Sequence, residues 1–224
     1  MYKKPMKVDL KISTELQDYL GSLKDMEARV YDIQNKKAPT LLWFLEYPPL
    51  FTEGRNSGSS LKFDCMKDIP TWVAPRGGKT TYHGPGQRVV YVLLNLENHE
   101  KDIKKFVFFL EEWILETLSL LGVKGKRCYD RIGVWVDTPQ GEKKIAALGV
   151  RLQKWVASHG FSLNVHPDLG AYRKIVPCGL ENYGVTSLHD LGVLVSMEDV
   201  DQILLETFPK VFQDVLKGTI DGYY

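Results

Sequence analysis

The chain has 224 residues, of which 44% are hydrophobic and 25% charged, a composition typical of a globular protein with one well-filled core. No stretch approaches the roughly 20 apolar residues of a bilayer-spanning helix, and the first ten residues lack the apolar core of a signal peptide. We therefore expect a single domain over residues 1–224, located in the cytoplasm, without a membrane partner. The net charge of +1 and the lack of a recognisable binding module disfavour nucleic acid.

Charge is unevenly distributed along the chain. Residues 122–154 carry eight basic and three acidic side chains, about +5, whereas residues 178–224 carry two lysines and eight acids, about −6. Two interpretations stay open: a docking face for an acidic partner, or two solvated surfaces.

The first half of the chain predicts one helix and three strands. A pattern typical of a capping box, Thr14-x-x-Gln17, opens apolar residues at helical spacing as far as Asn35. Short apolar runs then predict strands over 40–47, 71–74 and 89–96.

A glycine-dense loop, Arg76-Gly-Gly-Lys-Thr-Thr-Tyr-His-Gly-Pro-Gly-Gln87, lies between the second and third of these strands. Five of its twelve residues are glycine or proline, yet it also carries Arg76, Lys79, His83 and three hydroxyl groups. Glycine lets the backbone approach a ligand closely, while the hydroxyl and basic groups supply donors and proton carriers. The loop therefore predicts a functional site. Its place between strands argues against a dinucleotide or phosphate loop, which needs a helix amino terminus.

The second half predicts two helices and three strands. They are a helix over 102–121 ended by Gly122, a hairpin of 133–137 and 144–152, a strand over 156–165, and a helix opened by Ser196-x-x-Asp199. Pro209 should kink or interrupt the last helix. Because strands outnumber helices and several follow as hairpins, we predict an α+β fold with a mixed, mostly antiparallel sheet flanked by helices.

The cysteines Cys65, Cys128 and Cys178 form no Cys-x-x-Cys pair, which indicates neither a disulfide framework nor a zinc site. Cys178 lies between Pro177 and Gly179, on a turn that can present a thiol to a pocket; the alternative is an inert, partly buried thiol. Only a few per cent of a free thiol is ionised near neutrality. A nucleophilic Cys178 therefore needs a neighbour that removes its proton or stabilises the anion.

Lys144 is the leading candidate for that neighbour. Period-two alternation places it on one strand face with Ala146 and Leu148, and Lys143 on the other face, toward solvent. Burial lowers the pKa of a lysine and makes it a base, whereas a protonated lysine stabilises a thiolate by charge. A lysine that extends from a strand edge to solvent is the structural alternative.

Two histidines stand near these segments, His83 in the glycine loop and His159 in Ser158-His-Gly-Phe161. We expect both to have positioning roles. No set of histidines and acids shows metal-ligand spacing, so we expect no metal and no cofactor.

Four segments, in this order, together resemble the lipoyl(octanoyl) transferase family. They are 76–87, Lys144-Ile-Ala-Ala-Leu-Gly-Val-Arg151, Ser158-His-Gly-Phe-Ser-Leu-Asn164 and Ile175-Val-Pro-Cys-Gly179. Pro48-Pro-Leu-Phe-Thr-x-Gly54 fits as well, although Tyr47 stands where the family often has histidine, at a position expected to make a peripheral loop contact. The resemblance spans residues 41–188.

The resemblance implies a fold akin to biotin and lipoate protein ligases. It implies transfer of an octanoyl group from acyl carrier protein to a lysine of a lipoyl domain, in the E2 subunits of 2-oxoacid dehydrogenases and the glycine cleavage H protein. Cys178 would carry the acyl group as a thioester, and Lys144 would activate that cysteine. The implied substrate-binding residues are Arg76, Gly77, Gly78, Lys79, Thr80, Thr81, Tyr82, His83, Ala147, Leu148, Gly149, Gly160, Phe161 and Ser162. The basic stretch from Lys124 to Arg131 becomes a candidate docking surface for an acidic carrier protein.

Two rival functions remain at this point. An ATP-dependent lipoate or biotin ligase shares the implied fold but needs no nucleophilic cysteine. A non-catalytic binder of carrier proteins or lipoyl domains would leave Cys178 structural.

Overall fold

The computed structural model describes residues 7–56, 68–97, 101–175 and 183–216. The main sheet has eight strands in the order β1-β2-β6-β10-β9-β8-β7, with β11 paired to β9. These strands are β1 (Val8–Leu16), β2 (Thr40–Glu46), β6 (Gln87–Asn95), β7 (Gly125–Cys128), β8 (Arg131–Thr138), β9 (Gly141–Gln153), β10 (Val156–Asn164) and β11 (Gly184–Val185). A smaller sheet has the order β4 (Thr71–Val73), β3 (Leu50–Glu53), β5 (Thr80–His83). The helices are α1 (Tyr19–Gln34), α2 (Ile103–Leu120) and α3 (Met197–Leu216), with short 3-10 helices η1 (Leu169–Lys174) and η3 (His189–Leu191).

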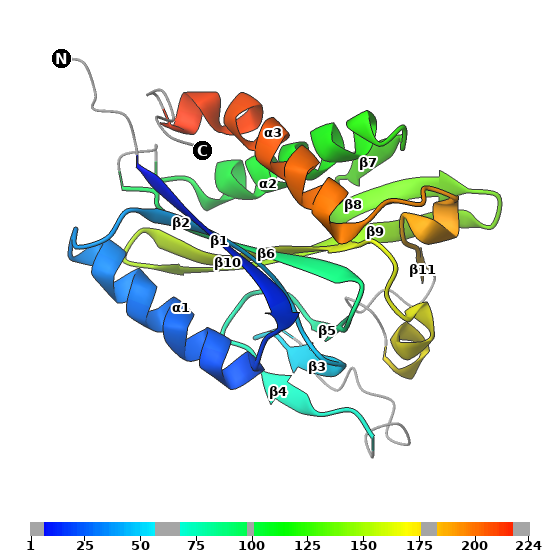
Figure 1. Cartoon of the computed structure of the whole chain (residues 1–224), viewed down its shortest axis with the longest axis horizontal. Coiled ribbons are helices and arrows are strands. Elements are labelled where there is room, and N and C mark those ends of the chain that lie inside the picture. The colour runs from blue at the N-terminus through cyan, green and yellow to red at the C-terminus, as the bar shows by residue number, and fades with distance from the viewer. Residues whose placement is uncertain (1–6, 57–67, 98–100, 176–182, 217–224) are drawn as a thin grey trace.

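Helices cover both faces of the main sheet, α1 on one side and α2 with α3 on the other (Figure 1). This explains why the central strands are apolar without interruption. Along β2, Leu42 and Phe44 join the core beneath α2 and α3, whereas Trp43 and Leu45 join the core beneath α1. A strand buried on both faces has no solvent side that would call for polar residues.

The pairing pattern confirms the predicted fold class. In the main sheet, neighbouring strands run antiparallel from β2 across to β7, and the parallel pairs are β1 with β2 and β11 with β9. The sheet is thus mixed and mostly antiparallel, with helices on its faces.

The amino-terminal prediction was wrong in one respect: Thr14 lies in a strand and caps no helix. β1 pairs in parallel with β2, with Val8 opposite Thr40 and Ile12 opposite Phe44. Helix α1 begins only after Asp18, whose Oδ2 accepts a hydrogen bond of 2.6 Å from the Gly21 amide. This segment is a strand because it pairs with a strand more than 20 residues further along the chain, and a local sequence pattern carries no signal of that pairing.

The other two helices begin where the sequence predicts. Asp102 caps α2 through the amides of Lys104 and Lys105, and Ser196 and Asp199 hydrogen-bond reciprocally at the start of α3.

Helix α3, however, runs through Pro209 without interruption. Proline inside a helix costs about 3 kcal/mol. Phe208 and Phe212, both fully buried on either side of it, recover about 1.5–3 kcal/mol each. Packing against the sheet and α2 therefore outweighs the lost backbone bond.

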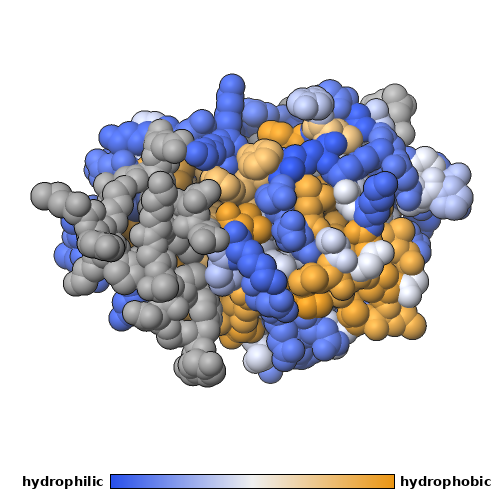
Figure 2. Space-filling view, turned by 90° about the horizontal axis from the view of Figure 1, so that it is seen from above, coloured by the Kyte–Doolittle hydropathy of each residue, from blue (hydrophilic) through white to orange (hydrophobic). Residues whose placement is uncertain are grey.

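Figure 2 looks onto the side of the molecule that carries α2 and α3, where apolar patches lie among polar side chains. Four large apolar side chains in α2 and in the segment that follows it are exposed, namely Phe108, Leu120, Tyr129 and Ile132. Ile132 also lines the cavity described below.

Candidate functional site

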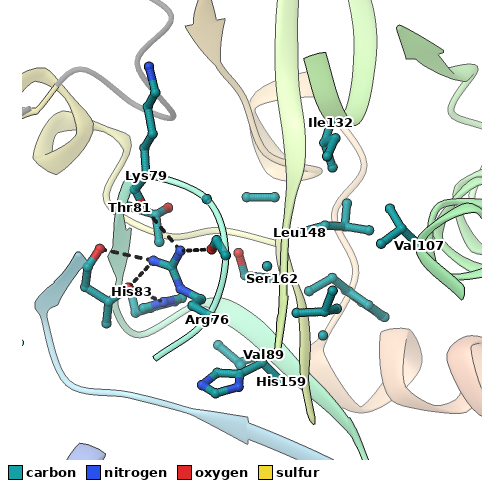
Figure 3. A pocket seen from close by; sticks show the side chains of 18 of the residues that line it. Arg76, Lys79, Thr81, His83, Val89, Val107, Ile132, Leu148, His159 and Ser162 are labelled. Atoms are coloured by element: carbon teal, nitrogen blue, oxygen red, sulfur yellow. Dashed lines mark hydrogen bonds between the residues drawn. The ribbon is translucent and has the colours of Figure 1, made fainter. Parts of the chain in front are cut away.

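A cavity of about 460 Å³ lies where the glycine loop meets β9 and β10 (Figure 3). Its volume is within the roughly 300–1,000 Å³ that small-molecule sites occupy. Arg76, Thr81 and His83 lie on one side of it, and Leu148 and Val107 on the other, so it has a polar side and an apolar side (Figure 3).

The structure brings most of the predicted site residues together around this cavity. Those that line it are Lys144, Arg76, Gly77, Gly78, Lys79, Thr81, His83, Ala147, Leu148, Gly149, Gly160, Phe161 and Ser162. Segments about 80 residues apart in the sequence thus meet at one place.

Two predicted residues, Thr80 and Tyr82, lie away from the lining because a third of the glycine loop is the strand β5. Successive side chains of a strand point to opposite faces, so Thr81 and His83 face the cavity while Thr80 and Tyr82 face away. The Tyr82 ring packs 5.8 Å from Phe51 and 5.5 Å from Tyr172, centroid to centroid.

Of the three cysteines, Cys128 lies within the described residues, whereas Cys65 and Cys178 lie outside them. Burial raises the pKa of the Cys128 thiol, which favours the un-ionised form. The pairing of Cys178 with Lys144 therefore stays a prediction.

The buried guanidinium of Arg76 holds the glycine loop in shape. Its Nη1 donates to the carbonyls of Gly77 and Lys79 at 3.0 and 3.1 Å. Its Nη2 donates to the carbonyl and the Oγ1 of Thr52 on β3, at 3.1 and 2.6 Å. The loop is also joined to β9, because the Gly77 amide donates to the Val150 carbonyl at 2.9 Å.

His83 is fixed on both ring nitrogens. Nδ1 lies 2.6 Å from Oε1 of Gln87, and Nε2 lies 3.3 Å from Oγ1 of Thr52. Burial, and secondarily the charge of Arg76, lower the pKa of His83 to about 4. The ring is therefore neutral near physiological pH, which fits a positioning role.

His159 is neutral for the same reasons, since burial and the charges of Arg76 and Arg151 lower its pKa to about 3. It lines the cavity, and its Nε2 has no hydrogen-bond partner among the residues that the structure describes. A buried polar atom without a partner is costly, so a ligand atom placed here would satisfy it.

Tyr47 is not the peripheral contact that the sequence suggested. It is fully buried, its Oη lies 2.9 Å from that of Tyr91, and its ring lies 5.9 Å from His83. The expectation was wrong because β2 ends inside the molecule, directly behind the cavity wall.

Lys144 is 5% exposed, which rules out a side chain extended from a strand edge into solvent. Its Nζ donates to the Ile132 carbonyl at 3.0 Å and lies 4.8 Å from the centroid of the Trp135 ring. Its carbonyl accepts a hydrogen bond of 2.9 Å from the Thr186 amide. Lys143, expected to face solvent, is itself partly buried, with Nζ 3.8 Å from Asp190.

The sequence did not indicate a cavity-lining role for nine further residues. They are Tyr19, Thr52, Val89, Tyr91, Val107, Asp130, Arg131, Ile132 and Val150. Thr52 and Val150 stood in motifs that gave a signal without indicating this role. The others stand in no motif, and only folding places them together.

The basic stretch from Lys124 to Arg131 is largely compensated by acids. Lys126 lies 2.6 Å from Asp137 and 2.5 Å from Glu142. The guanidinium of Arg127 contacts Glu111 and Glu112, and that of Arg131 contacts Asp130 and Glu142. These ion pairs disfavour the interpretation of this stretch as a free basic docking face.

In the described part of the chain, no helix has the length and apolar character needed to span a bilayer. The same residues hold no group of three or more His, Cys, Asp or Glu side chains arranged to ligate a metal ion.

The fold is that of lipoate protein ligases. The chain superposes on the crystal structure of lipoate-protein ligase A bound with ATP, with a TM-score of 0.76 and 21% identity over 93% of this chain and 86% of that one. A bipartite lipoate protein ligase from Thermoplasma acidophilum gives a TM-score of 0.67 and 19% identity over 94% and 85%. Identities this low establish the fold alone.

Sequence similarity then gives the family. The family model described as the lipoyl protein ligase A/B catalytic domain matches residues 18–209. The octanoyltransferase of Zymomonas mobilis is 47% identical, over 90% of this chain and 93% of its own. That of Paramagnetospirillum magneticum is 48% identical, over 92% and 97%. The chain belongs to the lipoyl protein ligase A/B catalytic domain family, among its octanoyltransferases, which confirms the predicted resemblance.

Proposed function

We propose that this chain is an octanoyltransferase that moves an octanoyl group from acyl carrier protein, through a thioester on Cys178, to a lysine of a lipoyl domain. The observation that carries the proposal is the buried Lys144 on the wall of a cavity that has an apolar side, in a chain nearly half identical to octanoyltransferases.

The first step forms the acyl-enzyme. Lys144 accepts the proton of the Cys178 thiol or stabilises its thiolate, and the sulfur attacks the thioester carbonyl carbon. The bond from that carbon to the carrier sulfur breaks, and the carrier leaves as a thiol after protonation. One thioester replaces another, so neither ATP nor a metal ion is needed to drive this step.

The second step transfers the group to the acceptor. The lysine amine of a lipoyl domain attacks the Cys178 thioester, the carbon–sulfur bond breaks, and an amide forms with loss of one proton. Conversion of a thioester to an amide is downhill. Acceptors of this kind are the lipoyl domains of 2-oxoacid dehydrogenase E2 subunits and the glycine cleavage H protein.

The cavity supplies the binding interactions for this chemistry. Leu148, Val107 and the small residues Ala147 and Gly149 offer an apolar side to the acyl chain. Nε2 of His159 and Oγ1 of Thr81, both on the cavity wall, have no hydrogen-bond partner among the described residues and are available to polar atoms of the substrate. A few residues after Cys178 the chain pairs with β9 as strand β11, in which Val185 is the register partner of Lys144.

The test is an incubation with octanoyl acyl carrier protein and a lipoyl domain, without ATP, followed by intact-mass measurement. We expect a gain of one octanoyl group on Cys178, reversed by hydroxylamine, and then octanoylation of the domain. Cys178→Ala should lose both, while the matched variant Cys128→Ala should keep both. Strict dependence on ATP and free acid would instead assign the chain to the ligases.

A further inference from the structure

We infer that Glu111, on helix α2, is a positioning residue for Lys144 and acts through the peptide group that joins Ile132 to Gly133. This inference goes beyond the proposed function and rests on it only in assigning a catalytic role to Lys144. Glu111 stands in none of the glycine motifs.

One peptide group is hydrogen-bonded on both of its sides. Its carbonyl, from Ile132, accepts the bond of 3.0 Å from Lys144 Nζ. Its amide, from Gly133, donates a bond of 3.1 Å to Oε1 of Glu111. Hydrogen bonds in such a chain polarise one another, so the carboxylate makes the Ile132 carbonyl a stronger acceptor for the lysine.

The peptide group is shaped for this task. Gly133 has a φ of 130°, a conformation that other residues rarely adopt, and it precedes the register shift between Val134 and Trp135 where β8 pairs with β9. A Cβ on Gly133 would lie 3.1 Å from Lys144 Nζ and 2.9 Å from the Ala146 carbonyl. The lysine side chain therefore crosses directly over this glycine.

Glu111 is itself buried, at 9% exposed, and a buried carboxylate is retained at a cost. Burial raises the pKa of Glu111, while the Gly133 amide, Arg127 and Lys144 favour its ionised form. Its Oε2 lies 3.3 Å from Nε of Arg127. The Glu111 carboxylate, on α2, thus contacts two groups: the Gly133 amide next to Lys144 and the Arg127 guanidinium of β7.

Two more charged groups near Lys144 come from Asp130, in the turn between β7 and β8, and from Arg131, the first residue of β8. Asp130 and Arg131 line the same cavity, and the Arg131 guanidinium lies 4.7 Å from the Trp135 ring that Lys144 also contacts. Arg131 is paired with Asp130 and Glu142. Loss of the Glu111 charge therefore removes one negative charge near Lys144, while the ion pairs of Arg131 stay in place.

The neighbouring Glu112 provides a matched control. It pairs with the same Arg127, but from a side chain that is 34% exposed. Glu111→Gln and Glu112→Gln each remove one carboxylate from the same guanidinium. The carboxylate that accepts from Gly133 is removed in the first variant alone.

The experiment is an NMR titration of the full chain carrying ¹³Cε-labelled lysine, with the Lys144 resonance assigned by its loss in Lys144→Arg. Glu111→Gln should move the Lys144 midpoint to lower pH by about one unit, because the carboxylate on the other side of the shared peptide group no longer favours the ammonium. Glu112→Gln should move it by at most a few tenths. Equal midpoints in the two variants overturn the inference.

The pH profile of octanoyl transfer is measured in parallel on the same proteins. Whether Lys144 acts as a base or as a cation, its limb of the profile should move to lower pH in Glu111→Gln. A wild-type protein without transfer would overturn the proposed function, while the titration would still decide on Glu111. Should Glu111→Gln fail to fold, Glu111→Asp, which draws the charge back by one methylene, should give a smaller shift in the same direction; an unchanged midpoint there overturns the inference too.

Discussion

Arg76 and Thr52, residues 24 apart in the sequence, are joined by a hydrogen bond of 2.6 Å from Nη2 to Oγ1 inside the protein. The same Oγ1 lies 3.3 Å from Nε2 of His83. One hydroxyl on β3 thus holds the arginine that shapes the glycine loop and the histidine that ends β5. The cavity wall therefore depends on Thr52, which lies outside the glycine loop of residues 76–87.

Replacement of Thr52 by valine should destabilise the protein. Valine keeps the shape and the main-chain carbonyl but removes the hydroxyl acceptor of the buried Arg76 guanidinium, at a cost of about 1–3 kcal/mol in the free energy of unfolding. Denaturant unfolding measures this, with Thr138→Val in the exposed β8–β9 turn as the control. A loss no larger than that of the control would contradict the assigned role of Thr52.

Stability should fall in mild acid because of His83 and His159. Their folded-state pKa values are lowered to about 4 and about 3, from an ordinary 6.5, so the unfolded chain binds protons first as pH falls. Stability from these rings is fully present above pH 6.5 and is lost progressively down to about pH 4 and pH 3. The loss reaches about 3 kcal/mol or more for each ring.

Unfolding free energies measured between pH 7.5 and 4 check this prediction. His159→Gln should flatten the acid limb, whereas His166→Gln, at an exposed histidine, should leave it unchanged. An equally steep limb in both variants would count against a neutral, buried His159.

Gly133→Ala should impair catalysis more than stability alone explains. Its φ of 130° strains any side chain, and the new Cβ would meet Lys144 Nζ at 3.1 Å. Gly141→Ala is the control, since Gly141 has a φ of 104° but open space around its Cβ position. Each should cost about 1–3 kcal/mol of stability.

The two variants separate in the transfer assay. Because Gly133→Ala displaces the lysine, octanoyl transfer should fall at least about tenfold, whereas Gly141→Ala should transfer at nearly the wild-type rate. Similar rates in both would mean that the position of Lys144 over Gly133 does not matter.

Substitutions of Lys144 itself separate the two roles left open for it. Lys144→Met removes both base and charge and should abolish transfer. Lys144→Arg keeps a charge but cannot be deprotonated in proteins, so it should be active only if charge stabilisation suffices. Single-turnover acylation measured near neutral pH decides, and full activity of Lys144→Arg excludes the base.

Local pattern predicted much of the fold, for identifiable reasons. The capping residues Asp102 and Ser196 and the apolar runs of β2 and β6 are signals contained within a few residues. Where prediction failed, a distant partner decided: β1 is a strand because it pairs with β2. Of the kink or interruption expected at Pro209, the interruption does not occur, and the flanking phenylalanines of α3 are buried.

By itself the sequence determined the fold class, the family, and which glycine-rich segments surround the cavity, because motifs and periodicity are local features that can be recognised in the sequence alone. Only the tertiary structure decided that Arg76 shapes its own loop, that Tyr47 is buried, and that Glu111 reaches Lys144 through a shared peptide group. These relationships join side chains from separate elements, whose distances are set by how the helices and strands pack and by no spacing along the chain.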